Sequence, residues 1–148
     1  MTLEILKAKE ELRSLIDAYA SLGDQKKIAE MMDLFTEDLT YTVFMNGQVV
    51  SSVSGRTKME QDFLLHAAQV KTYFTLNGQH EVDIAADTAT GISFSQLKMV
   101  REIEGIDILT DYSVRYEDKY LLKNGKWLIK ERVGHFLIIE ARPLTVTS

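Results

Sequence analysis

The spacing of apolar residues is helical in the first part of the chain and strand-like in the second. Apolar residues at i, i+3 and i+4 intervals over 3–22 predict a first helix with one core-facing stripe. Gly23 is expected to end that helix in a left-handed conformation. A shorter stripe over 28–35 predicts a second helix, and Thr57 and Glu60 have the spacing of a capping box that starts a third.

Alternating segments joined by tight turns follow the third predicted helix. The Asn124-Gly125 pair predicts a two-residue type I′ turn, because these residues readily adopt positive φ angles. Asn46-Gly47 gives the same signal for an earlier hairpin between residues 39 and 52. The later strands are expected at residues 79–85, 88–101, 109–122 and 126–144. Strands that follow one another in this way form an antiparallel meander.

These elements predict an α+β fold. Three helices cannot cover both faces of so long a sheet. They are therefore expected to pack in the concave face of a strongly curved, mixed and mostly antiparallel sheet. The resulting cone leaves one pocket, which is the default site for a ligand. Its outer face would stay apolar, and sheet-to-sheet pairing through it predicts a homodimer.

The last strand decides which polar side chains reach that pocket. Trp127 sets its parity, and an unbulged strand places His135 on the inner face and Arg132 on the outer face. A bulge after Trp127 would exchange the two. A core histidine bonded to the backbone or to a tyrosine is the alternative for His135.

Composition narrows the class of protein. The 148 residues are predicted to form one domain, and the absence of cysteine excludes disulfides and thiolate chemistry. A net charge of −5 argues against nucleic acid as a partner. No apolar run is long enough for a signal peptide or a membrane span, so a cytoplasmic protein is expected. Neither a phosphate-binding loop nor metal-ligand spacing occurs, and we expect no cofactor and no metal.

Three local patterns resemble one known family. They are Tyr19-Ala-Ser-Leu-Gly-Asp24 with Leu34-Phe-Thr-Glu-Asp38, Val82-Asp-Ile-Ala-Ala-Asp-Thr-Ala-Thr-Gly91, and Arg115-Tyr-Glu-Asp118 leading to Asn124-Gly-Lys-Trp-Leu-Ile129. Because these patterns occur in this order, the chain resembles the SnoaL-like branch of the NTF2-like superfamily, whose fold is a cystatin-like α+β cone. This branch includes polyketide cyclases, scytalone dehydratase, bile-acid dehydratase and a dehydrochlorinase. The resemblance covers roughly residues 12–132.

The resemblance implies a pair of catalytic groups. In lyases of this branch an Asp at the start of the second helix and a His on a strand form a general-base pair, and the Asp position falls on Asp24. Tyr19 also matches the dehydratase pattern, and a tyrosine hydroxyl can hydrogen-bond an oxygen on which charge develops. The alternatives are structural: Asp24 as the N-cap of the second helix, and Tyr19 as a packed core aromatic.

The histidine of that pair has no counterpart at the usual place. The family position falls near residues 75–78, none of which is His. His80 shares strand parity with Val82 and could point inward, or it could lie at the rim. His135 is the second candidate, because the bile-acid dehydratase pattern carries a basic residue near this point. His66, on the inner face of the third helix, is expected to be structural.

Two functions remain open from the sequence. The first is a cofactor-free lyase or isomerase of dehydratase or cyclase type, acting by proton transfer on a hydrophobic polycyclic or terpenoid-like molecule. Asp24 with His80 or His135 would move the proton, and Tyr19 or Tyr41 would polarise an oxygen. The residues expected to contact the substrate are Tyr41, Met31, Phe35, Phe63 and Trp127. The second is a non-catalytic module that binds a small ligand or serves for dimerisation.

Overall fold

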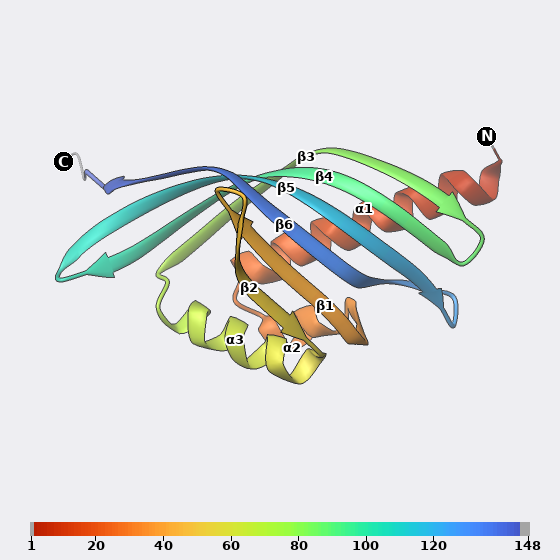
Figure 1. The fold of residues 1–148 in the computed structure, drawn as a ribbon, viewed down its shortest axis with the longest axis horizontal. Coiled ribbons are helices and arrows are strands. Elements are labelled where there is room, and N and C mark those ends of the chain that lie inside the picture. The colour runs from red at the N-terminus through yellow and green to blue at the C-terminus, as the bar shows by residue number, and fades with distance from the viewer. Residues whose placement is uncertain (1, 146–148) are drawn as a thin grey trace.

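The computed structural model describes residues 2–145, as three helices and a six-stranded sheet (Figure 1). The helices are α1 (Leu3–Asp24), α2 (Ile28–Met32) and α3 (Arg56–Ala68). The strands are β1 (Phe35–Met45), β2 (Gln48–Ser54), β3 (Thr72–Ala85), β4 (Thr88–Ile103), β5 (Ile106–Lys123) and β6 (Lys126–Pro143). The order of helices and strands agrees with the sequence prediction.

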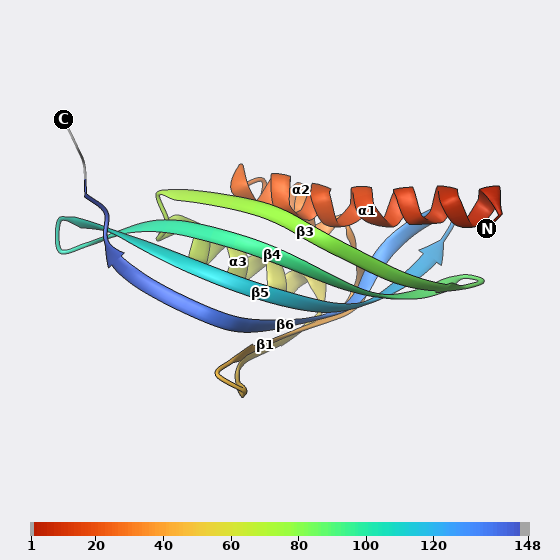
Figure 2. The same cartoon turned by 90° about the horizontal axis from the view of Figure 1, so that it is seen from above.

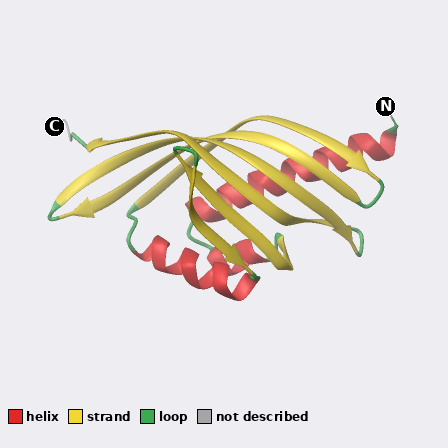
Figure 3. Ribbon diagram, in the orientation of Figure 1, coloured by secondary structure: helices red, strands yellow, loops and turns green. Residues whose placement is uncertain are grey.

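The sheet is mixed and strongly curved. Its strand order is β2-β1-β6-β5-β4-β3, and only the β1–β6 pair is parallel. Figure 2 shows α1 lying along one side of the curved sheet, and Figure 3 shows α1 passing behind the strands with the two shorter helices below them. The predicted α+β cone, with the helices in the concave face of a mostly antiparallel sheet, is confirmed.

The Asn-Gly turns have the predicted conformation. Asn124 and Gly125 have φ angles of 53° and 76°, and Lys123 pairs with Lys126 across them. Asn46 and Gly47 have the same pair of values. Positive φ at both central residues is what a type I′ turn requires. The two Asn-Gly pairs therefore predicted the turns of both hairpins correctly.

The helix ends differ from the prediction. Gly23 does not end α1, which continues through Asp24, and the residue with positive φ is Lys26. An added Cβ at Gly23 would lie 2.8 Å from Met31 Cε, the flexible end of that side chain, which would have to shift. The expected capping box is also wrong: α3 begins after Gly55, and no side chain caps it.

Two bulges reset the parity of β6. Tyr120 pairs with Ile129 but Lys119 pairs with Glu131, so Lys130 is an extra residue on β6. The second shift lies between Ser113 and Val114. An extra residue turns every later side chain to the opposite face until the next bulge.

The predicted faces of Arg132 and His135 are therefore exchanged. Arg132 faces the interior, opposite Asp118 of β5, and is 2% exposed. His135 lies on the outer face, where its ring stacks on Phe44 and its Nε2 is 2.9 Å from Glu117 Oε1. The inward orientation predicted for His135 is wrong, because it assumed a strand without a bulge.

The core lies between α1, α2 and the inner face of the sheet. Its least exposed side chains come from α1, from α3 and from the strands β1, β5 and β6. They include Leu12, Ile16, Phe35, Leu39, Met59, Tyr120 and Ile129. Burying a large apolar side chain contributes about 1.5–3 kcal/mol, so this cluster stabilises the closed part of the cone. The rest of the interior of the cone encloses a cavity.

Candidate functional site

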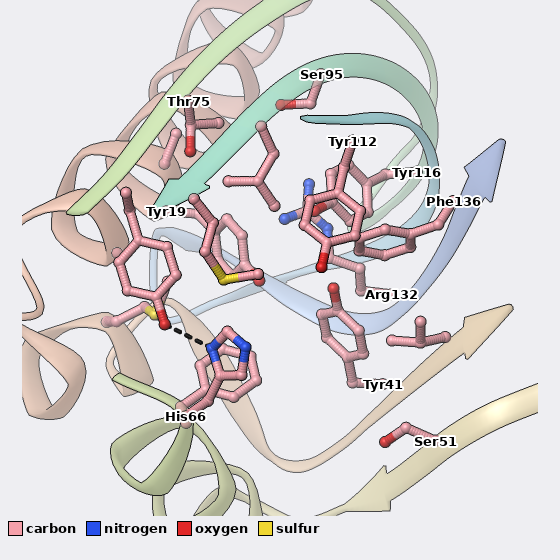
Figure 4. A pocket seen from close by; sticks show the side chains of 18 of the residues that line it. Tyr19, Tyr41, Ser51, His66, Thr75, Ser95, Tyr112, Tyr116, Arg132 and Phe136 are labelled. Atoms are coloured by element: carbon pink, nitrogen blue, oxygen red, sulfur yellow. Dashed lines mark hydrogen bonds between the residues drawn. The ribbon is translucent and has the colours of Figure 1, made fainter. Parts of the chain in front are cut away.

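A cavity of about 360 Å³ lies between the helices and the concave face of the sheet (Figure 4). Its walls are mostly apolar, and the buried residues of the lining come from α2 and from the strands β1, β2, β4, β5 and β6. Val50, Ser51 and His66 are the exposed members of the lining, and they mark its mouth. The volume is within the range of small-molecule sites, which runs from about 300 to 1,000 Å³.

An arginine and three tyrosines form a cluster in the lining of the cavity. The Arg132 guanidinium lies 3.8 Å from the ring centre of Tyr116 and 4.3 Å from that of Tyr19, so it is held between two aromatic rings. Tyr41 completes this cluster from β1, where it is paired with Arg132. A cation over a desolvated aromatic ring is worth about 2 kcal/mol or more.

The Arg132 side chain is also fixed by a buried carboxylate. Its Nε donates to Asp118 Oδ1 at 2.9 Å, and its Nη2 donates to Oδ2 at 3.3 Å. Burial alone would lower the pKa of Arg132, but Asp118 and the surrounding tyrosines raise it above its ordinary value. Nη1 has no partner among the described residues, although it is buried. A buried N–H without a partner is costly, and a ligand oxygen would satisfy it.

The tyrosines of the cluster remain neutral at physiological pH. Burial raises the pKa of Tyr19, Tyr41 and Tyr116 above the ordinary value of 10.0. Neighbouring Arg132 opposes this shift in each of them. Their hydroxyl groups can therefore act as hydrogen-bond donors towards an oxygen in the cavity.

Asp24 lines the cavity from the last turn of α1. Thr75 of β3 donates to both oxygens of this carboxylate: its backbone N–H to Oδ2 at 2.8 Å and its hydroxyl to Oδ1 at 2.7 Å. The structural alternative for Asp24 is not realised, because Lys27 occupies the N-cap position of α2. Asp24 is thus an oriented carboxylate beside the cavity, paired with a threonine and not with a histidine.

His66 is the imidazole of the cavity. It projects from α3, and its Nδ1 lies 2.5 Å from the hydroxyl of Tyr73, the contact dashed in Figure 4. Burial, followed by the charge of Arg101, lowers its pKa below the ordinary 6.5. Its ring is therefore neutral at pH 7 and can accept a proton. Burial raises the pKa of Tyr73 to about 12, so this hydroxyl keeps its proton.

The comparison with known protein families agrees with this architecture. Residues 4–133 match the family described as SnoaL-like domain. The chain belongs to the SnoaL-like family. The sequence prediction of the NTF2-like superfamily is thereby confirmed. A search of curated proteins finds no match to this SnoaL-like chain.

Solved structures share the fold at low sequence identity. One is a protein from Novosphingobium aromaticivorans assigned provisionally as a scytalone dehydratase, with a TM-score of 0.82, 17% identity and coverage of 100% of this chain and 95% of that chain. Another is hexachlorocyclohexane dehydrochlorinase LinA-type3 from Novosphingobium barchaimii, with a TM-score of 0.75, 16% identity and coverage of 96% and 93%. A third is the beta subunit of a provisionally assigned aromatic-ring-hydroxylating dioxygenase from N. aromaticivorans, with a TM-score of 0.77, 17% identity and coverage of 92% and 93%.

The SnoaL-like cavity gathers some of the predicted site residues and not others. Those that line it are Tyr19, Asp24, Met31, Tyr41 and Phe63. Phe35 and Trp127, predicted to contact substrate, belong to the packed core and are absent from the lining. His135 is outside because of the β6 bulge. His80 is also outside the lining; it follows a bulge in β3, and its Nε2 contacts the hydroxyl of Tyr120 at 3.2 Å.

The sequence prediction missed the two basic side chains of the cavity. His66 was expected to be structural, and it instead lines the mouth. Arg132 was expected to face outward. A signal for the bulge exists in the sequence, because three apolar residues, 127–129, are followed by the charged run Lys130-Glu-Arg132, which breaks strict alternation. The pairing of Arg132 with Asp118 could then be predicted from the hairpin register.

Within residues 2–145, no group of three or more His, Asp or Glu side chains is placed to hold a metal ion. Among the same residues, no helix combines the length and apolar character needed to cross a membrane.

Proposed function

We propose that this SnoaL-like protein is a cofactor-independent lyase or isomerase that moves a proton on a largely apolar molecule bearing an oxygen. One observation carries the proposal: an apolar cavity holds a buried arginine–tyrosine cluster with an unpartnered Nη1, and an imidazole with a lowered pKa lines the same cavity. An oxygen acceptor and a proton acceptor are the two things such a reaction needs.

The proposed reaction starts at His66. Its neutral ring takes a proton from a carbon next to a ligand carbonyl, and the electron pair of the C–H bond moves onto the carbonyl oxygen. Arg132 and the hydroxyl groups of Tyr41 and Tyr116 hold that oxygen as negative charge develops. In an isomerase, the imidazolium returns the proton to a different carbon. In a lyase, the enolate expels a β-hydroxyl group, which leaves as water with the proton from His66.

Asp24 is proposed to take part through its position. Its carboxylate is fixed by Thr75, and it can stabilise an imidazolium or orient a ligand hydroxyl at the cavity wall. The direct Asp–His pair of the family resemblance is replaced here by Asp24–Thr75 and Tyr73–His66. Because Tyr73 and Thr75 are two residues apart on β3, both pairs are presented on the same face of that strand.

The test starts from binding. Hydroxylated steroids and aromatic polyketides are screened for thermal stabilisation, and each binder is then incubated with the enzyme and followed by mass spectrometry. We expect loss of water or isomerisation of at least one binder. His66→Gln should abolish turnover, and Asp24→Asn should reduce it. Leu65→Gln, an exposed neighbour on the same helix, is the matched control. Turnover that persists in His66→Gln would contradict the proposed base.

A non-catalytic binding module is the second candidate. It is favoured by one observation, namely that both oxygens of Asp24 are already engaged by Thr75 and that this carboxylate has no histidine partner. If the protein is a binding module, the molecules that bind it should stabilise it against heat and should be chemically unchanged after long incubation.

The proposed assembly is a homodimer through the outer face of the sheet, and the proposed location is the cytoplasm. Apolar side chains that alternate with the cavity-facing residues of β3 and β4 support the dimer. They are Phe74, Leu76, Ile92 and Phe94, each at least 39% exposed.

A further inference from the structure

A chain of hydrogen bonds connects the cavity arginine to His80, a residue that does not line the cavity. Arg132 donates to Asp118, the Tyr120 hydroxyl donates to Asp118 Oδ2 at 2.9 Å, and His80 Nε2 lies 3.2 Å from the same hydroxyl. Arg132, Asp118 and Tyr120 are at most 3% exposed. Water therefore does not interrupt the chain over these three residues.

The direction of the two hydrogen bonds at Tyr120 is fixed because its hydroxyl group carries one proton. The phenol of Tyr120 has one proton, which it gives to Asp118. Its oxygen can then only accept from His80, so the Nε2 of His80 must carry a proton. The neutral Nε2–H tautomer and the imidazolium both satisfy this condition. They differ at Nδ1, and the chain stays intact in both protonation states.

We propose that His80 is a positioning residue, whose protonation is transmitted through Tyr120 and Asp118 to Arg132 and so tunes how strongly the cavity holds a negatively charged ligand oxygen. A cationic ring donates more strongly to Tyr120, which in turn donates more strongly to Asp118. The carboxylate then shares its negative charge between His80 and Arg132. Less of the guanidinium charge is compensated, and its face towards the cavity becomes more attractive to an anion.

The charged groups around His80 are few and can be named. From α1, Arg13 and Asp17 face it and form an ion pair with each other at 3.1 Å. From β5 and β6, Asp118 and Arg132 face it. Burial lowers the pKa of His80; Asp118 and Asp17 raise it, and Arg13 and Arg132 lower it further. The net direction is downward, so the switch operates on the acid side of 6.5.

The inference reaches the proposed function only through Arg132, and its test needs no ligand. In the ¹⁵N-labelled full chain, the Nε–H of Arg132 and the ring nitrogens of His80 are followed by NMR between about pH 8 and 5, the interval that spans the ordinary histidine pKa. We expect the Arg132 signal to shift with the same midpoint as the His80 ring. His80→Gln, which can still donate to Tyr120 but cannot titrate, should keep the Arg132 signal in place and remove its shift.

Two further variants separate the relay from simpler effects. Tyr120→Phe should remove the Arg132 shift while His80 still titrates. His135→Gln, on the outer face, should leave the shift unchanged. An Arg132 signal that does not move through the His80 midpoint would overturn the inference, as would a shift that persists in His80→Gln. If Tyr120→Phe fails to fold, His80→Gln alone decides. Neither result bears on turnover, so the proposed function can fail or stand independently.

Discussion

At the scale of single residues, the buried Arg132–Asp118 pair is the feature on which the site depends. Two charges at 2% and 3% exposure are tolerated because the carboxylate accepts three hydrogen bonds and the guanidinium lies between two aromatic rings. A buried pair is weak evidence for stability in itself, since desolvation opposes the attraction. Its value here is to fix the guanidinium, whose Nη1 has no partner among the described residues, in the lining of the cavity.

Breaking this pair should be costly. Arg132→Met leaves Asp118 buried without its cation, and we expect a loss of about 3–5 kcal/mol in the free energy of unfolding. Lys119→Met is the control, because Lys119 pairs with Glu131 at the exposed surface, where such a pair is worth about 1 kcal/mol or less. Urea unfolding measures both. Equal losses in the two variants would mean that the buried pair has no special role.

The lowered pKa values of His66 and His80 make stability depend on pH. Burial lowers the pKa of His66 and of His80 below 6.5, so during acidification the unfolded chain takes up protons before the folded one. Their contribution to stability is full above 6.5 and is lost as the pH falls through the folded-state values. Urea unfolding between about pH 7 and 5 should show this decline. The slope should be smaller in His80→Gln and in His66→Gln than in the wild type; an identical slope in all three proteins would contradict the argument.

Residue-level prediction from the sequence succeeded where a local pattern was sufficient. Tyr19 was placed beside the cavity by the core-facing stripe of the first helix, and Asp24 by the family resemblance. Arg132 and His135 were assigned to the wrong faces because strand parity accumulates over the whole strand, and a single extra residue reverses it. The histidine of the cavity was sought on a strand, whereas α3 supplies it.

At the scale of elements, the turns were easier to predict from the sequence than the bulges. Asn46-Gly47 and Asn124-Gly125 identify their hairpins through a local backbone requirement. The bulge at Lys130 depends instead on which of two registers buries the better set of side chains. The regular register would bury His135 and expose Arg132, which would leave Asp118 without its cation. The bulged register pairs both charges.

Close packing between neighbouring strands also supports the relay. Gly91 of β4 lies against Tyr120 of β5, and an added Cβ would be 2.8 Å from Tyr120 Cε2 and 3.0 Å from its hydroxyl oxygen. Gly91→Ala should therefore displace the ring and destabilise the protein by about 1–3 kcal/mol. In Gly78→Ala the nearest atom is 3.6 Å away, and the change should stay within about 0.5 kcal/mol. Thermal or urea unfolding compares the two; a neutral Gly91→Ala would show that the ring has room to move.

At the scale of the whole molecule, fold class and element order were predictable because they follow from periodicity and chain direction. Apart from one hairpin, helical spacing ends near residue 70 and alternation fills the rest of the chain, so few helices are available and they were expected on one face of the sheet. The curvature that creates the cavity comes from twist and bulges acting over six strands, and no short pattern encodes it.

The apolar outer face of the sheet predicts that the protein forms a dimer. Leu76 is 59% exposed and Phe94 is 39% exposed, and burying them against a second copy would remove an apolar patch from water. Sedimentation velocity should find a dimer at micromolar concentration. Leu76→Lys with Phe94→Lys should convert it to a monomer, whereas Leu65→Lys on α3 should not. A wild-type protein that sediments as a monomer would exclude this interface.

The most direct measurement of the central claim is hydrogen exchange in a bound ketone. The tightest-binding ketone of the ligand panel is incubated with the protein in D₂O, and deuterium at the carbon next to the carbonyl is followed by NMR. The account predicts incorporation that is fast with the wild type, is lost in His66→Gln and is strongly reduced in Arg132→Met. A ketone that binds in the cavity and gains no deuterium above the rate in buffer would contradict proton transfer, and it would leave a binding module as the function.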